Sequence, residues 1–374
     1  MIQFKQLSFW EKVTLFEQID FLIVGAGIVG SACAFELSKK FPSAKIIILE
    51  RSYLPLGAST KNAGFACFGS ATELLDDLET MDENKVWETV SKRYEGLIKL
   101  QERFSKTAID FNPCGGYDLV ESDSLLHLDQ LDYLNQKIEK TLSLTNCYSL
   151  KKNLQEEYGF QRFKFAYFNQ YEGAIDTGKL MLETQKKLSQ QDIHVVYGIE
   201  VSSYNRHTNE VIVSTNYGEI IASNLVFAVN SFAKQLLPHL PVEPARAQVL
   251  VTSEISNLKL NSTFHYDKGY YYFRNIGRRV LLGGARNLDF AAENTFSLEQ
   301  PTLIQHRLEQ FLREEILPNS TFDIEYRWSG TMGVGETKSP LIGKISPNCA
   351  YAVRLGGMGV ALGSLVGEEL ASLF

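Results

Sequence analysis

The sequence predicts an α/β fold in which a nucleotide-binding unit is interleaved with a second, sheet-rich unit of α+β type. The first observation is an apolar run that ends at three glycines spaced G-x-G-x-x-G, Gly25, Gly27 and Gly30. The second is another apolar run, which ends in the carboxylate of Glu50. The third is the alternation of helical and strand patterns along the chain without repeats or a linker, which favours interleaved domains over consecutive ones.

Each glycine of the motif has a physical role. Gly25 permits a tight turn from strand to helix, Gly27 lets a pyrophosphate approach the backbone, and Gly30 lets the helix pack closely on the strand. The N-terminus of the following helix offers free N–H donors and a partial positive charge. Glu50 is expected to accept hydrogen bonds from ribose hydroxyls. We therefore expect a Rossmann-like dinucleotide-binding domain; an ordinary glycine-rich turn is the alternative.

Composition and charge bound the class of protein. The chain has 374 residues, 44% hydrophobic and 22% charged, which is typical of globular proteins long enough to form two connected domains. The net charge of -7 argues against a general nucleic-acid surface. The longest apolar stretch, from Phe21 to Phe35, is too short to span a bilayer. We expect no transmembrane segment and no nucleic-acid partner.

Cysteine and histidine usage indicates reduced thiols and offers no metal site. The five cysteines are scattered, odd in number and without a C-x-x-C pair, which favours free thiols over a disulfide framework. The six histidines include no H-x-x-x-H pair, and none lies within four residues of a cysteine. The N-terminus lacks the features of a secretory signal, so a cytoplasmic location is expected.

Local patterns predict the remaining elements. Ser8 and Glu11 fit a capping box that opens a short helix, which we expect to pack onto the body of the protein. Further helices are predicted at 28–40, 72–104, 125–142, 150–158, from about 176, at 298–316 and from about 360. Residues 113–120 are predicted to be a turn into a strand, and further strands are predicted at 45–49, 193–197, 200–204, 211–214, 219–222, 224–230, 269–274 and 279–284.

Five segments carry a family resemblance. Glu50 and Arg51, followed by the small and polar residues 57–64, resemble the flavin-binding loop of the D-amino-acid oxidase and glycine/sarcosine oxidase superfamily. The segments 174–180, 225–230, 328–343 and 356–363 resemble later motifs of that superfamily in the same order and spacing. The resemblance spans nearly the whole chain and implies FAD rather than NAD.

The resemblance also implies which residues contact the flavin. No Cys or His lies at a family attachment position, so FAD is expected to be bound without a covalent link. A glycine-rich turn that opens a helix at Gly359 would place N–H donors near the ligand, although an ordinary helix start is the alternative. The expected FAD contacts are Gly25, Gly27, Ile28, Val29, Gly30, Glu50, Arg51, Ser59, Thr60, Asn62, Ala63, Gly64, Val201, Asn230, Gly330, Gly356, Gly357, Met358, Gly359 and Val360.

The same resemblance divides the chain into two domains. Residues 1–71, 171–244 and 326–374 are expected to form a discontinuous FAD-binding domain. Residues 72–170 and 245–325 are expected to form the substrate domain that covers the flavin.

The implied reaction oxidises the carbon next to an amine. A hydride passes from that carbon to flavin N5, and the resulting imine is hydrolysed. Because the chemistry belongs to the flavin, the protein mainly binds, orients and desolvates the neutral amine. No side-chain acid or base is strictly required, and the sequence shows no evident catalytic constellation of His, Cys or Ser.

The substrate end departs from the family pattern. At the position where amino-acid oxidases of this family usually hold a substrate carboxylate with an arginine, this chain has Met332. Either the substrate lacks that carboxylate or another arginine binds it. Met332 itself is expected to line the flavin face as an apolar packing residue. Strand alternation places Tyr270, Tyr272 and Arg274 on one face, which makes Arg274 a candidate, with Arg286 as another. The alternatives are a solvent-facing Arg274 and a surface ion pair for Arg286.

Several functions stay open at this point. The electron acceptor is oxygen, for an oxidase, or a quinone or other carrier, for a dehydrogenase. A flavin-binding protein without amine oxidation and a flavoenzyme that modifies RNA are further alternatives. The substrate and the oligomeric state are not predicted.

Overall fold

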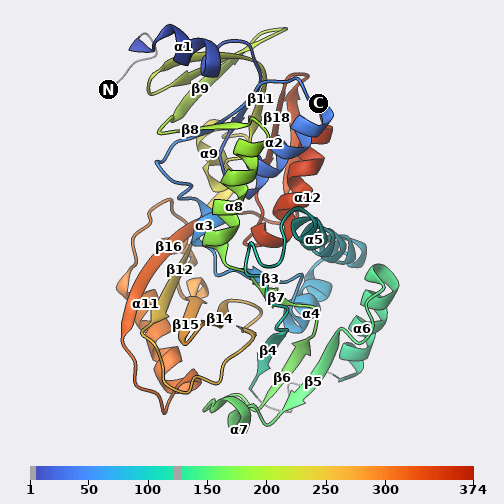
Figure 1. Ribbon diagram of the computed structural model, residues 1–374. Helices are drawn as coiled ribbons and strands as arrows, with labels where there is room; N and C mark the ends of the chain where they lie inside the picture. The colour runs from blue at the N-terminus through green and yellow to red at the C-terminus, as the bar shows by residue number, and fades with distance from the viewer. Residues whose placement is uncertain (1–5, 122–127) are drawn as a thin grey trace.

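The computed structural model describes residues 6–121 and 128–374 and confirms the predicted α/β fold. Two eight-stranded sheets form the centre of the molecule, and a two-stranded sheet lies between them in Figure 1. Residues 125–127 of the predicted helix 125–142 lie outside the described residues, and α6 starts at Leu128. Among the described residues, we find no helix that is both long enough and apolar enough to cross a membrane.

The first sheet holds the glycine motif. Its strand order is β17-β18-β11-β1-β2-β8, and β9 and β10 continue from β11 as antiparallel strands. The strands β18, β11, β1, β2 and β8 are mutually parallel, as expected for a Rossmann-like domain. The strands are β1 (Ile19–Val24), β2 (Ile46–Glu50), β8 (His194–Tyr197), β9 (Val201–Arg206), β10 (Val211–Thr215), β11 (Gly218–Phe227), β17 (Leu341–Ser346) and β18 (Cys349–Val353).

Side-chain alternation along β1 divides the core of this sheet. Phe21 and Ile23 belong to the core shared with the helices, whereas Leu22 and Val24 pack with β9, β10 and β11 on the other face. Every one of these four side chains is buried, so the strand reads as a nearly continuous apolar run. The helices on the first face are α2 (Ile28–Lys40), α5 (Glu83–Arg103), α8 (Thr177–Gln190) and α12 (Gly359–Ser372).

The second sheet forms the lower part of the molecule in Figure 1 and is mostly antiparallel. Its strand order is β16-β12-β15-β14-β13-β4-β6-β5, with β4 and β13 as the parallel pair. The strands are β4 (Gly116–Val120), β5 (Tyr148–Lys152), β6 (Phe165–Asn169), β12 (Glu243–Thr252), β13 (Thr263–Tyr266), β14 (Tyr271–Ile276), β15 (Arg279–Gly284) and β16 (Ile324–Val334). The expected domain boundary at residue 326 falls inside β16, which pairs with β12 along its length.

The two faces of the second sheet differ in what covers them. On the outer face, the rings of Phe264 and Phe273 stack at 4.8 Å and pack with Phe311. On the inner face, Tyr272 packs with Phe65, which follows the glycine-rich loop. The strand neighbours Tyr271 and Phe273 belong to the outer-face core, so Tyr272 alternates with them as expected, whereas Tyr270 precedes β14 and packs against that core.

Short elements connect the sheets. The small sheet pairs β3 (Phe65–Ala66) with β7 (Gly173–Ala174). The remaining helices are α1 (Phe9–Glu11), α3 (Ala58–Lys61), α4 (Ala71–Thr80), α6 (Leu128–Leu142), α7 (Leu154–Tyr158), α9 (Ala233–Leu236), α10 (Phe290–Glu293) and α11 (Thr302–Phe311), with π turns at Lys12–Phe16 and Leu312–Ile316 and 3-10 turns at Asn230–Phe232 and Arg286–Leu288.

Several predictions about local structure were wrong. The predicted helix 72–104 is two helices, α4 and α5, because the backbone is extended at Met81 and Asp82. The strands predicted at 219–222 and 224–230 form one strand, β11. The capping box at Ser8 and Glu11 forms, but α1 does not pack onto the body: Phe9 and Trp10 are 69% and 75% exposed and contact each other. The segment 150–158 is not one helix, because its first residues complete the sheet edge as β5, and Asn153, at φ +66°, separates that strand from α7. Tertiary pairing here overrides local helical preference.

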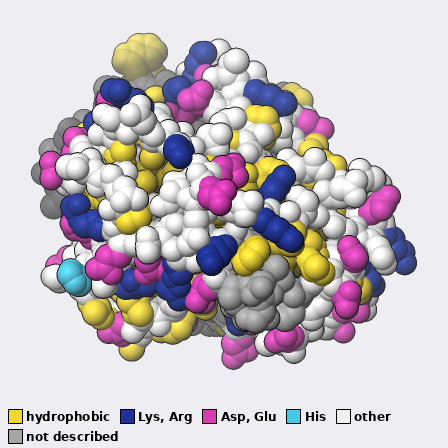
Figure 2. All heavy atoms as spheres, turned by 90° about the horizontal axis from the view of Figure 1, so that it is seen from below, with side chains coloured by type: hydrophobic (Ala, Val, Ile, Leu, Met, Phe, Trp, Pro, Cys, Tyr) yellow, Lys and Arg dark blue, Asp and Glu magenta, His cyan; other side chains and the backbone are white. Residues whose placement is uncertain are grey.

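The five cysteines are free thiols, as predicted. On the face shown in Figure 2, lysine and arginine side chains are interspersed with aspartate and glutamate rather than gathered into a field of one sign.

Glycines allow α12 to lie against its neighbours at very short distance. A Cβ added at Gly96 of α5 would lie 1.9 Å from the Ala361 carbonyl oxygen of α12. A Cβ added at Gly367 of α12 would lie 2.4 Å from the Cβ of Ala32 in α2. Since backbone and buried Cβ atoms cannot rotate away, larger residues would push these helices apart.

We predict that Gly96→Ala destabilises the protein. Helix propensity alone favours alanine by about 1 kcal/mol, but the clash with the Ala361 carbonyl forces overpacking that costs about 1–3 kcal/mol or more. Urea unfolding followed by circular dichroism should show a lower midpoint than wild type. The exposed Glu88→Ala on the same helix serves as control and should stay within about 0.5 kcal/mol. An unchanged or higher midpoint for Gly96→Ala would contradict the close crossing.

Candidate active site

A cavity of about 1080 Å³ lies between the two large sheets. It begins beyond the carboxyl ends of β1 and β2, where open α/β sheets bind their ligands, and its walls include Gly27, Glu50 and Val201. It continues to the inner face of the second sheet. We call that part the substrate end and define it by Phe65, His265, Tyr270, Tyr272, Arg286 and Met332.

The glycine motif forms a tight cradle at the first part of the cavity. Gly25 has φ +107°, and a Cβ there would lie 2.6 Å from the Ala228 carbonyl oxygen. A Cβ at Gly30 would lie 2.0 Å from the Gly25 carbonyl oxygen, so the close packing expected of Gly30 is present. The first turn of α2 faces the cavity, and its Ile28 N–H donates to Ser59 Oγ at 3.0 Å.

Glu50 is fixed before any ligand binds. Its Oε2 accepts a hydrogen bond from the Ala26 N–H at 3.2 Å, and its Oε1 accepts one from the Ser52 N–H at 3.1 Å. Burial raises the pKa of Glu50, and the hydrogen bonds from the two backbone N–H groups partly offset this rise. Glu50 lines the cavity, and each of its carboxylate oxygens can accept a further hydrogen bond. Ribose hydroxyls would need such acceptors.

A second helix N-terminus reaches the cavity from the C-terminal segment. Gly356 and Gly357 both have positive φ, and they lead into α12, whose first residues Gly359 and Val360 line the cavity. A Cβ at Gly357 would lie 3.3 Å from Met332 Sδ, which places Met332 beside this turn. The first-turn N–H groups of α12 therefore offer donors and a positive dipole end.

These features fit FAD. Two helix N-termini, the carboxylate of Glu50 and a glycine-rich backbone cradle line one continuous cavity. In addition, Thr331 Oγ1 in the cavity wall is buried without a hydrogen-bond partner among the described residues, as expected for a group that a cofactor completes.

Most of the residues predicted to contact FAD line this cavity. Thr60, Gly64, Gly30 and the substrate-binding candidate Arg274 do not. Thr60 Oγ1 donates to the Pro55 carbonyl at 2.5 Å and shapes the loop instead. The predicted residues in the cavity wall are Gly25, Gly27, Ile28, Val29, Glu50, Arg51, Ser59, Asn62, Ala63, Val201, Asn230, Tyr272, Gly330, Met332, Gly356, Gly357, Met358, Gly359 and Val360.

The two candidate arginines have different positions. Arg274 shares a strand face with Tyr272, but its Nη1 lies 3.4 Å from the Gly64 carbonyl oxygen, behind the cavity wall. Arg286 lines the substrate end and lies over the rings of Tyr270 and Phe290, at 5.8 and 5.0 Å. Burial lowers the pKa of Arg286, yet an arginine keeps its charge at neutral pH.

Three cations and one histidine near the substrate end already have carboxylate partners. Arg93 and Lys338 both contact Glu73, whose pKa they lower to about 2 despite burial, and Lys338 also contacts Asp77. Lys268 pairs with Asp76, and His265 pairs with Glu172. In the part of the chain that the structure describes, Arg286 makes no ion pair, which leaves its guanidinium available to an anionic ligand.

A buried pair of one histidine and one glutamate lies at the substrate end and was not predicted from the sequence. His265 Nε2 lies 2.9 Å from Glu172 Oε2, and Cys67 lies beside them, with one potential ligand atom from each within 4.8 Å of the others. No metal site was expected from sequence spacing, because these residues come from distant segments. The mutual hydrogen bond already satisfies His265 Nε2 and Glu172 without a metal ion.

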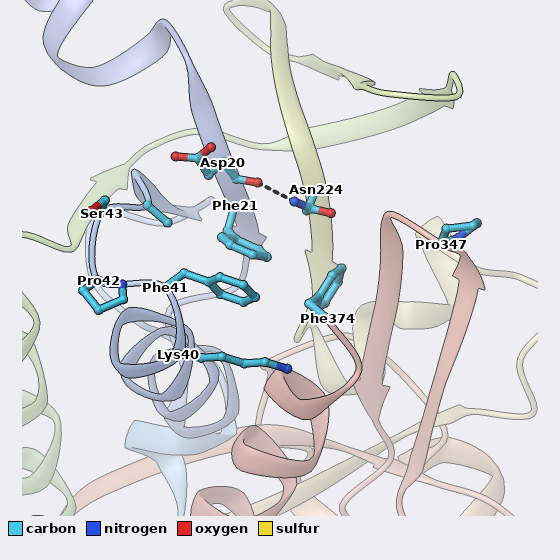
Figure 3. Close-up of a pocket in the computed structure, with 10 residues that line it drawn as sticks. Asp20, Phe21, Lys40, Phe41, Pro42, Ser43, Asn224, Pro347 and Phe374 are labelled. Atoms are coloured by element: carbon cyan, nitrogen blue, oxygen red, sulfur yellow. Dashed lines mark hydrogen bonds between the residues drawn. The ribbon is translucent and has the colours of Figure 1, made fainter.

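A second pocket, of about 650 Å³, is open and lies elsewhere (Figure 3). Phe21, Phe41 and Phe374 line it, and the Asn224 side chain donates to the Asp20 carbonyl at 2.9 Å. It sits at the beginning of β1, the opposite end of the strand from the glycine motif. We therefore assign no ligand to it.

The fold and the cavity together are those of a dinucleotide-binding protein. A family model described as FAD dependent oxidoreductase, the DAO family, matches residues 20–373. The chain belongs to this family of FAD-dependent oxidoreductases. It is accordingly an enzyme whose cofactor is FAD, as the sequence resemblance predicted.

Individual relatives are distant. Gamma-glutamylputrescine oxidoreductase of Escherichia coli is 23% identical, over 96% of this chain and 85% of that protein. The crystal structure of L-proline dehydrogenase from P. horikoshii has a TM-score of 0.76 at 20% identity and covers 96% of this chain and 94% of that one. Glycine oxidase from Geobacillus kaustophilus has a TM-score of 0.75 at 18% identity, with 95% and 94% covered. At these identities the likeness to the solved structures shows the fold.

We predict that Glu50→Ala weakens FAD binding about ten- to one-hundred-fold. The variant removes charge-assisted hydrogen bonds that contribute about 1.5–3 kcal/mol. Titration of the apoprotein with FAD, followed by quenching of flavin fluorescence, measures the change. The exposed Glu219→Ala is the control and should bind FAD like wild type. Equal affinity for wild type and Glu50→Ala would exclude Glu50 as the ribose acid.

Proposed function

We propose that this enzyme oxidises the C–N bond of a small amine that carries a carboxylate, an amino acid or an N-substituted amino acid. The observation that carries the proposal is Arg286, a half-buried cation at the substrate end without an ion-pair partner among the described residues. A charge that is partly withdrawn from water is stabilised by an opposite charge, so an unpaired guanidinium in a cavity wall favours an anionic ligand. A guanidinium also matches a carboxylate in a two-point geometry.

The surroundings of Arg286 support a small substrate. Tyr270 and Tyr272 flank it, and the Tyr272 hydroxyl has no hydrogen-bond partner in the described part of the chain. Burial raises the pKa of Tyr272 to about 12, so this phenol stays protonated and can donate to a carboxylate. Met332, in place of the arginine usual in the family, adds an apolar wall.

These side chains bind and orient the substrate. Arg286 and Tyr272 hold the carboxylate, and the rings of Phe65, Tyr270 and Tyr272 exclude water from the carbon that is oxidised. FAD, when bound, supplies the acceptor for the hydride. The cavity residues near Met332 and the N-terminus of α12 would lie against it and stabilise negative charge.

Related proteins agree with this class of substrate. Their names specify a gamma-glutamylputrescine oxidoreductase, an L-proline dehydrogenase, a glycine oxidase and an iminodiacetate oxidase. The acceptor is oxygen or an electron carrier, and turnover under anaerobic conditions with an artificial acceptor separates the two. The cytoplasmic location stays a prediction.

The test is an anaerobic screen of amines and of D-, L- and N-methyl amino acids, read as bleaching of the flavin absorbance. We expect reduction by carboxylate-bearing amines and little by the same amines without the carboxylate. Reduction by amines irrespective of a carboxylate would overturn the role of Arg286, and reduction by none of these compounds would overturn C–N oxidation.

We predict that Arg286→Gln weakens binding of the best amino-acid substrate about thirtyfold or more. Removing one partner of a desolvated charge pair costs about 2–5 kcal/mol. Stopped-flow measurement of flavin reduction against substrate concentration gives the dissociation constant. The exposed Arg278→Gln, on the turn between β14 and β15, is the matched control and should leave it unchanged. A large loss in Arg274→Gln but none in Arg286→Gln would return the role to Arg274.

A further inference from the structure

The substrate end contains a histidine whose surroundings suit proton transfer. His265 is 8% exposed and lines the cavity, and Glu172, which bonds its Nε2, is 1% exposed. When Nε2–H donates to Glu172, Nδ1 carries the lone pair and has no partner among the described side chains. The pair thus presents a basic nitrogen at the cavity wall and a buried carboxylate behind it.

The position of Glu172 is fixed by the fold. Its Oε2 also accepts a hydrogen bond from Thr263 Oγ1 at 3.3 Å, and a Cβ at Gly116 would lie 1.9 Å from that oxygen. Glycine at 116 is therefore required to make room for the carboxylate. The ring of His265 contacts the ring of Phe65 at 5.1 Å, which fixes its other side.

His265 lies in one row with the residues that form the substrate end. Its register partner on β14 is Tyr272, and its register partner on β4 is Asp118. Tyr272 in turn neighbours Arg286, whose charge acts on its phenol. A small zwitterion held at Arg286 would therefore present its nitrogen on the His265 side of Tyr272.

We propose that His265 accepts a proton from the ammonium group of the substrate through Nδ1 and that Glu172 is its positioning residue. The inference rests on the proposed function. The N–H bond of the ammonium breaks, its proton moves to Nδ1, and the nitrogen keeps the electron pair as a neutral amine. That lone pair then assists loss of the hydride from the adjacent carbon, which gives an iminium ion. The electrons leave with the hydride and the proton stays on His265.

The charges around His265 favour this step. Burial opposes a charged imidazole, but the charge and the hydrogen bond of Glu172 outweigh it and raise the pKa of His265. Asp118, whose pKa burial raises to about 6, accepts hydrogen bonds from the N–H and hydroxyl of Thr72 and adds a second negative charge above that pH. The titratable and charged groups facing His265 from the packed elements are Cys67, Glu73, Asp118, Glu172 and Tyr272.

The test is the pH dependence of flavin reduction in the holoenzyme. Only unprotonated His265 accepts a proton, so the rate at low substrate concentration should rise with pH through the pKa of His265. Glu172→Gln keeps a hydrogen-bonding group but removes the charge, and the rising limb should move to lower pH by about one unit or more. His265→Gln should lose about 10² in rate at neutral pH, and its limb should move up to the pKa of the substrate amine.

Controls separate this proposal from folding and from the proposed function. The exposed His306→Gln should behave like wild type, and unchanged flavin absorbance shows that each variant is intact. An NMR titration of His265, independent of turnover, should show a lower pKa in Glu172→Gln. The role of His265 alone would be overturned if the rate of flavin reduction in wild type rose with the pKa of the substrate amine and this pH dependence were unchanged in Glu172→Gln. Absence of flavin reduction by every amine would overturn the proposed function instead.

Discussion

Close backbone packing of α12 against α2 and α5 is the constraint on which the site depends. Gly96, Gly363 and Gly367 leave no room for a Cβ at these crossings, with the nearest neighbouring atoms at 1.9, 2.5 and 2.4 Å. The crossings bring the N-termini of α2 and α12 to one cavity, although the two helices are more than three hundred residues apart in the chain. The positive dipole ends of both helices therefore face the same cavity.

The second sheet adds polarity to this cavity. Its inner face carries Asp118, His265 and Tyr272 in one row, and Arg286 follows the end of β15. The α4 carboxylates Glu73 and Asp77 neutralise Arg93 of α5 and Lys338. Arg286, in contrast, makes no ion pair among the described residues and follows β15, on the other side of Tyr272 from His265. The substrate end is thus positive at Arg286 and negative around Glu172 and Asp118. A zwitterionic amine complements that arrangement in one orientation only.

Local sequence predicts many of the residues that line the first part of the cavity. The roles of Gly25, Gly27 and Gly30 follow from backbone geometry, which depends on adjacent residues, and the same holds for the turn at Gly356 and Gly357. Thr60 shows the limit of motif reasoning, because its hydroxyl stabilises the loop and does not line the cavity.

The substrate end was harder to predict because it depends on tertiary contacts. Strand alternation correctly placed Arg274 on the same face as Tyr272. Arg274 is two residues further along the strand, however, and its guanidinium contacts the Gly64 carbonyl behind the cavity wall. His265 and Glu172 are 93 residues apart in the chain, and no spacing pattern links them. Their contact follows from the pairing of β4 with β13 and β6, which a single sequence does not specify.

In the proposed substrate position, the carboxylate contacts the Arg286 guanidinium and the nitrogen contacts His265 Nδ1. A crystal structure of the oxidised holoenzyme with 2-aminoisobutyrate tests it directly, because this amino acid has no hydrogen on its α-carbon and cannot be oxidised. The expected result is a carboxylate hydrogen-bonded to the Arg286 guanidinium and an ammonium within hydrogen-bonding distance of His265 Nδ1. A ligand bound in the cavity with its carboxylate away from Arg286, or with its nitrogen directed away from His265, would contradict it.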